Sequence, residues 1–170
     1  MQSIIPPFIF DEIEKSGTIR QRIKISRAKA VLSAIRSDRL LYLEREGVEV
    51  ASSREIFDCE NTDDLRLVSV KTGDYDKSPN DDSVRDAYFN LSYVDKLFRD
   101  VYGRRSFDDK GSPLIASVHY LKGYDNAFWN GGQMVFGDGD SDLDEADRIF
   151  NRFTIDLDVT GHELTHGVIQ

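Results

Sequence analysis

Two histidines stand four residues apart near the end of the 170-residue sequence, in the stretch "DVTGHELTHGVIQ". In an α-helix, residues at positions i and i+4 lie on the same face, one turn apart. His162 and His166 can therefore present two imidazole nitrogens to one zinc ion. Glu163 is then placed to take a proton from a water that zinc has acidified, which lets hydroxide attack a peptide carbonyl. The spacing predicts a zinc site of hydrolytic type, and the alternative is two surface histidines on an ordinary helix.

The residues around this motif predict a helix that packs against the rest of the protein. We expect the helix to begin near Asp156, and its glycines, Gly161 and Gly167, leave room for a close neighbour. Its apolar residues are Val159, Leu164, Val168 and Ile169. A helix with this composition is buried or half-buried, which favours the zinc site over the surface alternative.

The composition excludes several classes of protein. The formal net charge of -9 argues against a nucleic-acid partner, because phosphate binding needs a basic surface. The apolar runs are too short for a membrane span. The N-terminus lacks the basic region and the uninterrupted apolar core of an ordinary signal peptide. Cys59 is the only cysteine, so an internal disulfide and a thiolate metal cluster are both excluded, and we expect a half-buried apolar residue there.

The charge divides the chain into two unequal parts. Residues 1–45 carry a net charge of +4, and residues 46–170 carry -13. Opposite charges of this size predict that the two parts attract each other, unless the imbalance arose by chance. The polar stretch 44–55 reads as an exposed junction between them, with a cleavage point between Glu46 and Ser53. In the basic part, the Pro-Pro pair predicts an extended segment over 4–10, and Ser26 predicts a helix N-cap.

The acidic part reads as alternating strands and helices. Residues 65–73 and 112–121 are predicted strands. A long helix is predicted from a capping box at Ser83 and Asp86 to a glycine stop at Gly103. Residues 126–140 read as a hairpin with its turn at Asn130 and Gly131.

Two features of the acidic part are discounted as metal sites. The acidic loop 138–147 fails the EF-hand pattern, because Leu143 and Ile149 stand where glycine and glutamate are required. His119 lies on a predicted strand, where a packed, hydrogen-bonded histidine is the simpler interpretation.

Three motifs then occur in a fixed order: "NAFWNG" at 126–131, "GDGD" at 137–140 and "DVTGHELTHGV" at 158–168. Over 65–170 the chain resembles the thermolysin family of zinc metallopeptidases. The N-terminal "IIPPFIF" resembles the Pro-Pro-hydrophobic motif in the short propeptides of the protealysin-like branch of that family. The precursors of this branch lack an ordinary signal peptide.

The resemblance implies roles for the residues of the last helix. His162 and His166 would be zinc ligands, and Glu163 would be the general base. Asp158 matches a calcium ligand of the family, so calcium is an expectation for the complete enzyme. The other carboxylates of that calcium site lie further along the family's chain.

The resemblance also implies a peptide-binding edge in "NAFWNG". Asn126 and Ala127 would pair with the substrate backbone as an added strand does. Phe128 and Trp129 would shape the cleft, and the alternative for Trp129 is a plain core aromatic. We therefore expect peptide or protein substrates, with cleavage before bulky apolar residues.

The implied organisation is a propeptide at 1–48 and the N-terminal lobe of the catalytic domain at 49–170. The expected fold is α+β, an antiparallel sheet-rich lobe that ends in the zinc-bearing helix. Pro6, Pro7 and Phe8 would anchor the propeptide on an apolar surface of the lobe. The third zinc ligand of the family, a glutamate on the next helix, would fall past Gln170. The chain is thus expected to lack the C-terminal helical lobe, to bind zinc weakly and not to catalyse efficiently.

The expected location is outside the cell, with a cytoplasmic stage before export. Two rival functions stay open at this point. One is a non-catalytic binding or inhibitory module derived from such a peptidase. The other is a different zinc hydrolase, against which the edge motif "NAFWNG" argues because it suits a peptide backbone.

Overall fold

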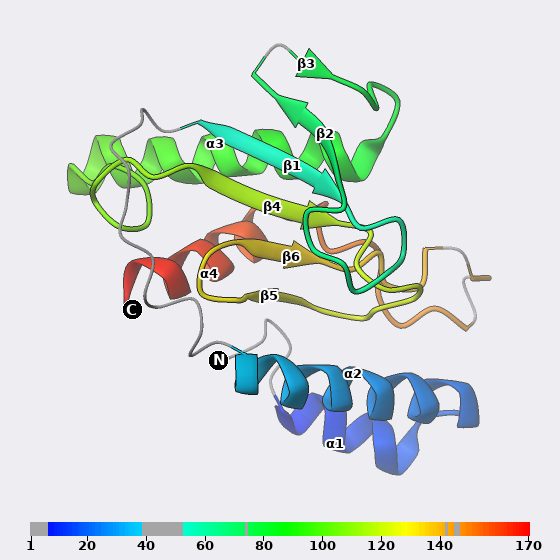
Figure 1. Cartoon of the computed structure of the whole chain (residues 1–170). Coiled ribbons are helices and arrows are strands. Elements are labelled where there is room, and N and C mark those ends of the chain that lie inside the picture. The colour runs from blue at the N-terminus through cyan, green and yellow to red at the C-terminus, as the bar shows by residue number, and fades with distance from the viewer. Residues whose placement is uncertain (1–6, 39–52, 74, 142, 145–146) are drawn as a thin grey trace.

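The computed structural model describes residues 7–38, 53–73, 75–141, 143–144 and 147–170 (Figure 1). The helices and strands have the following bounds: α1 Pro7–Ser16, α2 Ile19–Asp38, β1 Arg54–Asp58, β2 Val68–Thr72, β3 Tyr75–Asp76, α3 Asp82–Tyr102, β4 Leu114–Val118, β5 Ala127–Trp129, β6 Met134–Phe136 and α4 Leu157–Val168. The predicted strands at 65–73 and 112–121 and the predicted hairpin are confirmed as β2, β4 and β5–β6. The predicted junction and cleavage point fall largely outside the described residues.

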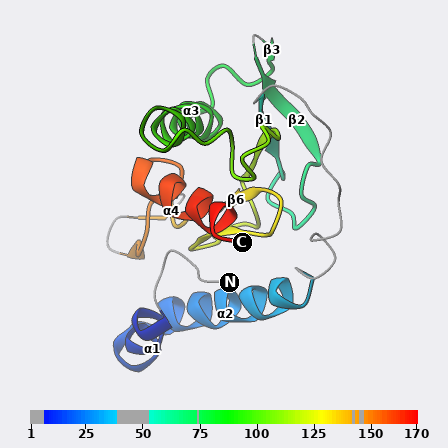
Figure 2. The same ribbon diagram turned by 90° about the vertical axis from the view of Figure 1, so that its left-hand side faces the viewer.

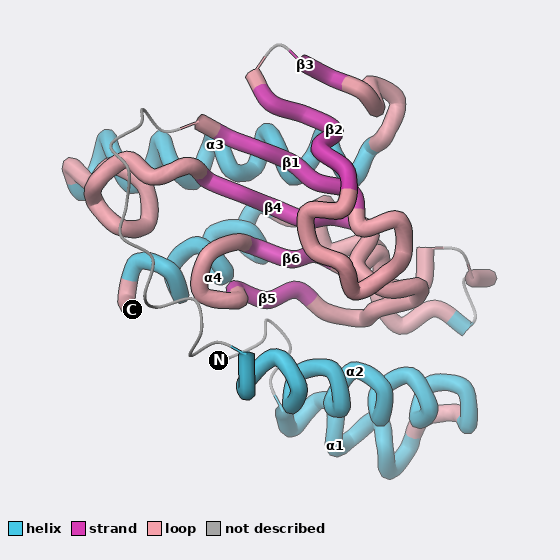
Figure 3. Tube along the Cα trace, in the orientation of Figure 1, coloured by secondary structure: helices cyan, strands magenta, loops and turns pink. Residues whose placement is uncertain are grey.

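The six strands form one mixed sheet in the order β3-β2-β1-β4-β6-β5. The pairs β1–β2, β2–β3 and β5–β6 are antiparallel, whereas β1–β4 and β4–β6 are parallel. Figure 3 shows these strands as one layer, with helices beside them. The α+β class is therefore confirmed, and the sheet contains two parallel pairings as well as the expected antiparallel ones. β5 forms one edge of the sheet.

Helices α3 and α4 cover the same face of the sheet (Figure 2). The apolar side chains of α3 form a stripe that is buried over its first half, with Val84 and Leu91 almost inaccessible to solvent. Towards the C-terminus the same stripe is open, since Leu97 is 53% and Val101 63% exposed. Cys59 is fully buried rather than half-buried, in a second cluster with Tyr120 and other residues.

The N-cap of α3 is Asp81, not Ser83 as predicted. The Asp81 carboxylate accepts hydrogen bonds from the backbone N–H groups of Ser83 and Val84, as an N-cap side chain does. The Ser83 hydroxyl instead donates to Asp138. The predicted stop at Gly103 is confirmed, with φ of 66° and a backbone N–H that bonds to the last turn.

His119 joins the start of α3 to the loop that follows β6. Its two ring nitrogens lie 2.6 Å from an Asp138 oxygen and 2.9 Å from an Asp81 oxygen. Burial lowers the pKa of His119, but the hydrogen bonds and charges of the two carboxylates outweigh burial and raise the pKa to about 10. The interpretation of His119 as a packed, hydrogen-bonded histidine is thereby confirmed.

This arrangement predicts a pH-dependent contribution to stability. Because the folded-state pKa of His119 is raised above the ordinary value of 6.5, its contribution is complete below about pH 6.5 and is lost as pH rises through about 10. A His119→Gln variant should be less stable at pH 6 by about 1.5–3 kcal/mol, the range for a hydrogen bond to a charged group. In urea unfolding, the difference between wild type and variant should shrink from pH 6 to pH 10. A difference in the free energy of unfolding that stays constant from pH 6 to pH 10 would contradict the role of His119 between Asp81 and Asp138.

Helices α1 and α2 form a hairpin in the basic part of the chain (Figure 1). The predicted extended segment is wrong from Pro7 onward, because proline is well tolerated in the first turn of a helix, where its missing N–H costs nothing. The predicted N-cap at Ser26 is also wrong, since α2 runs through it. A reciprocal capping box starts α2 instead: Thr18 N–H donates to Gln21 Oε1 at 2.8 Å, and Gln21 N–H donates to Thr18 Oγ1 at 3.3 Å.

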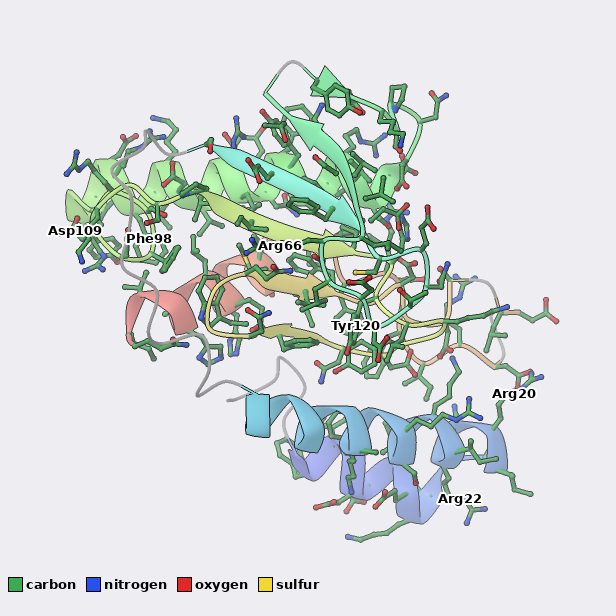
Figure 4. All side chains as sticks on the ribbon, viewed as in Figure 1. Arg20, Arg22, Arg66, Phe98, Asp109 and Tyr120 are labelled. Atoms are coloured by element: carbon green, nitrogen blue, oxygen red, sulfur yellow. The ribbon has the colours of Figure 1, made fainter. Side chains whose placement is uncertain are left out.

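This hairpin docks on the sheet domain through a small apolar contact and ion pairs. Phe10 and Ile25 are 3% and 0% exposed and belong to the same buried cluster as the residues of the sheet. Phe8, the predicted anchor, is 63% exposed, whereas Phe10 is the buried aromatic side chain of α1. Arg20 reaches from α2 to Asp147 at 2.8 Å (Figure 4). The predicted attraction between the two parts is thus seen as specific ion pairs.

Candidate active site

Helix α4 carries the predicted zinc ligands side by side. The Nε2 atoms of His162 and His166 are 3.0 Å apart. Two nitrogens that bind one tetrahedral zinc at about 2.0–2.1 Å lie roughly 3.3 Å from each other. The imidazole pair therefore fits a zinc ion without rearrangement of the helix. The predicted start of this helix is confirmed, with Asp156 at the N-cap position.

Glu163 lies on the buried side of α4. The residue is 0% exposed, and no hydrogen bond of ordinary geometry reaches either carboxylate oxygen among the described residues. Burial raises the pKa of Glu163 to about 8, although the nearby backbone of Trp129 offsets part of the shift. A buried carboxyl group with a raised pKa, beside two converging imidazoles, is typical of a general base.

The close approach of α4 to β5 depends on one glycine. A Cβ atom added at Gly167 would lie 2.9 Å from Cζ2 of Trp129 and 3.1 Å from Cβ of Phe107. At Gly161 the same atom would lie 3.8 Å from Val94, an ordinary contact. The expected role in close packing therefore applies to Gly167 and not to Gly161.

These two glycines provide a matched pair of variants. Gly161→Ala should leave the free energy of unfolding unchanged or raise it by up to about 1 kcal/mol, because alanine favours the helix. Gly167→Ala should lower it, since overpacking against Trp129 costs about 1–3 kcal/mol, more than the helical gain. Urea unfolding of both variants checks the difference. Equal stability of the two would mean that α4 and β5 are not as closely packed as the structure shows.

The predicted peptide-binding residues lie on and beside β5, at the edge of the sheet. Asn126 and Ala127 are both 0% exposed, and the Asn126 side chain accepts a hydrogen bond from the Ala127 N–H at 2.9 Å. Among the described strands, β5 pairs only with β6. The Asn130 side chain closes the turn between them by accepting from the N–H groups of Gly132 and Gln133. The expected edge position of this motif is confirmed.

Phe128 and Trp129 point into two different clusters of buried residues. Phe128 packs edge-on against Tyr120 and Tyr124. Trp129 lies beneath α4, with its ring 5.0 Å from that of Phe107. Both are 1% exposed, which places Trp129 in the core of this structure. Their contribution to a cleft stays a prediction.

Asp158, the predicted calcium ligand, lies apart from the histidines in the first turn of α4. It is exposed and lines a groove of about 1120 Å³ between α3 and α4. None of the other described residues that line this groove carries a carboxylate. Within the described ranges, no group of three or more His, Cys, Asp or Glu side chains converges on a metal position. The calcium assignment stays a prediction.

The structure thus brings together His162, Glu163 and His166 on α4, with Trp129 of β5 beside them. Tyr124 was missed from the sequence. Burial raises the pKa of its hydroxyl, and the nearby Tyr120 and Glu163 add to this shift. The only signal for Tyr124 in the sequence was its position two residues before the edge motif.

In the described part of the chain, no helix has both the length and the apolarity needed to cross a membrane.

Comparison with known proteins supports the peptidase resemblance that the sequence motifs predict. Residues 26–170 match the family model of the thermolysin metallopeptidase catalytic domain. The chain is 38% identical over 177 residues to protease PrtS of Photorhabdus sp. (strain Az29), covering 99% of this chain and 46% of that protein. It is 39% identical to an extracellular metalloprotease of Pectobacterium carotovorum subsp. carotovorum, covering 99% and 47%.

A solved structure extends the likeness to the whole fold. The precursor of protealysin, a metalloproteinase from Serratia proteamaculans, matches with a TM-score of 0.76 and 38% identity over 99% of this chain and 46% of that one. The chain therefore spans about half the length of these relatives. Family model, sequence and fold agree, and the chain belongs to the thermolysin family of metallopeptidases, in its protealysin-like branch.

Proposed function

We propose that this chain is the prosegment and N-terminal catalytic lobe of a zinc metalloendopeptidase precursor. The observation that carries the proposal is the pair of Nε2 atoms 3.0 Å apart on α4, with buried Glu163 between the two histidines in sequence. The printed names of the relatives, which are proteases and metalloproteases, support the same reading.

The residues of the chain have separate roles in the proposed reaction. Zinc, when bound at His162 and His166, supplies the polarisation of a peptide carbonyl and the acidification of a water. Glu163 accepts the proton from that water and delivers it to the departing amine. Its buried position excludes bulk solvent, which strengthens the electrostatic interactions at the reacting atoms. The β5 edge orients the substrate as an added strand.

We propose that the zinc site is completed by a part of the family fold that lies outside the present chain. A catalytic zinc takes three protein ligands, and α4 provides two among the described residues. The chain covers 46% of the protealysin precursor, which is consistent with a further lobe. By itself the chain should bind zinc weakly and hydrolyse peptides inefficiently. Calcium binding at Asp158 belongs to the same complete enzyme.

The helical hairpin α1–α2 is proposed to be part of a propeptide that spans residues 1–48. It lies along the β5 side of the sheet in both views of the ribbon, where a substrate strand would add (Figures 1 and 2). The match to a precursor structure supports this role. Pro6 lies outside the described residues, and Pro7 begins α1. Location outside the cell is proposed from the relative that is named as extracellular.

The test is the cleavage of matched peptides by the complete gene product. Peptides that differ only in the residue after one bond, Leu, Phe, Ala or Asp, are incubated with the enzyme and the fragments are weighed by mass spectrometry. We expect cleavage before Leu and Phe at rates at least tenfold above those before Ala and Asp, as one or two lost apolar contacts imply. A zinc chelator should abolish it. No cleavage of any peptide by the metal-loaded protein would overturn the proposal and favour a non-catalytic binding module.

A further inference from the structure

Two buried aspartates next to the β5 edge, Asp125 and Asp140, receive a lysine from α2, and the space between them is called the acidic pocket below. Lys24 Nζ forms an ion pair with Asp140 and lies 3.9 Å from an Asp125 oxygen. The side chains of Asp125 and Asp140 are 1% and 0% exposed, and that of Lys24 is 17% exposed. The Asp140 carboxylate at this depth is strongly unfavourable without a compensating charge, and Lys24 supplies that charge.

The pocket is built to hold a carboxylate in one orientation. One oxygen of Asp140, Oδ2, accepts a hydrogen bond from the Ile149 N–H at 2.9 Å, and the Asp140 N–H donates to the Phe150 carbonyl at 2.8 Å. This leaves Oδ1 directed at the lysine. Gly123, with φ of +64°, borders the lysine: a Cβ atom there would lie 3.4 Å from Lys24 Nζ, which is an ordinary contact.

The same pocket adjoins the proposed peptide-binding edge. Asp125 directly precedes Asn126, and the Asn126 carbonyl accepts a hydrogen bond from the N–H of Gly137, three residues before Asp140, at 3.0 Å. Lys24 enters from α2, which lies along the side of β5 where a substrate strand would add (Figures 1 and 2). A side chain that projects from a bound peptide would therefore approach the pocket from the side that Lys24 now uses.

We propose that Asp125 and Asp140 form a subsite for a basic side chain of the substrate, and that Lys24 occupies this subsite in the precursor. The inference rests on the proposed peptidase function. When the prosegment leaves, Lys24 vacates its position beside Asp140, and a lysine or arginine side chain of a substrate takes its place. The mature enzyme then recognises a basic residue at one fixed position, in addition to the apolar residue after the cleaved bond.

An organic ammonium group fits this pocket better than a metal ion. Calcium takes six to eight oxygen ligands, whereas two carboxylates lie within 4 Å of the Lys24 ammonium among the described residues. No third His, Cys, Asp or Glu side chain joins them to form a metal cluster in the part of the chain that the structure describes. The long, mostly buried lysine stem also shows that the pocket accepts an unbranched alkyl chain that ends in a charge.

The first test asks whether the pocket of the 170-residue chain recognises an alkylammonium ion. Lys24→Ala removes the group that n-propylammonium chloride restores. We expect n-propylammonium to raise the melting temperature of Lys24→Ala by several degrees more than equal sodium chloride does, and not to raise that of the Lys24→Ala, Asp140→Asn double variant. Arg20→Ala, which loses an exposed ion pair, should show no rescue. Rescue by calcium alone, or no rescue, would overturn the proposal.

The second test measures substrate preference in the complete gene product after the prosegment is removed. Peptides carry Lys, Arg, norleucine or Glu at each position around one cleaved bond. At one position, kcat/KM should be about 10- to 100-fold higher for Lys or Arg than for norleucine, the range for a hydrogen-bonded charge pair. In Asp140→Asn this ratio should fall towards one, whereas in Asp147→Asn it should persist.

The outcomes separate this inference from the function on which it rests. Cleavage of all the peptides without a basic preference at any position contradicts the subsite and leaves the peptidase function standing. Failure to cleave any peptide contradicts both. A basic preference that survives Asp140→Asn assigns the recognition to other residues and also contradicts the subsite.

Discussion

A Glu163→Gln variant of the complete gene product is expected to retain zinc and to lose peptidase activity by about 10²–10⁴-fold, the usual contribution of one general base. Glutamine has nearly the same shape as glutamate and fits the same buried position, but its amide cannot accept the proton. The change also removes a buried carboxyl group that has no hydrogen bond of ordinary geometry among the described residues. The variant should therefore fold at least as well as the wild type.

The measurement is kcat/KM on an apolar peptide together with the zinc content of the same preparation. Gly161→Ala is a suitable control, because it changes the neighbouring turn of α4 without a steric conflict. Loss of activity accompanied by loss of zinc would mean that Glu163 helps to hold the metal. Full activity in zinc-loaded Glu163→Gln would assign the proton transfer to another residue.

Replacement of either histidine of α4 should reduce zinc affinity more than any other single change in this chain. Removal of groups that only orient a metal ligand typically costs about 10–100-fold in affinity, and loss of a ligand itself should exceed that range. We therefore expect His166→Ala to weaken zinc binding by more than about 100-fold in a competition titration. His119→Gln, which changes the third histidine, should leave zinc affinity unaltered because His119 lies between Asp81 and Asp138 instead.

A result from either variant, His166→Ala or His119→Gln, could contradict this prediction. Tight zinc binding that survives His166→Ala would place the metal elsewhere. A loss of zinc in His119→Gln equal to that in His166→Ala, with both variants folded, would show that the affinity does not depend on the α4 pair.

The helix that carries the two histidines was predictable because its signals are local. The four-residue spacing of the histidines fixes their shared face in any α-helix, so the structure had little freedom to separate them. The hairpin was predictable for the same reason, since the turn residue Asn130 forms its hydrogen bonds within three residues. The parallel pairings of β4 with β1 and β6 were not predictable, because they join segments that are distant in sequence.

The secondary structure of residues 7–38 was mispredicted because two local signals competed. The proline pair favours an extended chain before it, but Pro7 itself suits the first turn of a helix. The Thr18 and Gln21 capping box was present in the sequence, while Ser26, an equally plausible cap by residue type, lies inside α2. Residue type alone does not choose between two caps; the packing of the helix hairpin does.

The acidic pocket could be predicted only in part from the numbers of charged residues in the sequence. The net charges of the two parts correctly predicted attraction between them. They did not identify Lys24 among the basic residues or Asp125 and Asp140 among the acidic ones. That choice depends on burial, which the tertiary fold determines, and a buried ion pair matters far more than an exposed one.

The central claim is that the α4 histidines hold the catalytic metal, and X-ray diffraction at the zinc absorption edge tests it most directly. Crystals of the complete gene product, soaked with zinc, should give an anomalous difference peak within bonding distance of both His162 Nε2 and His166 Nε2, with Glu163 facing it. A third ligand should come from outside residues 1–170. An anomalous peak at Asp158 or in the acidic loop, with none at the histidines under saturating zinc, would contradict the account.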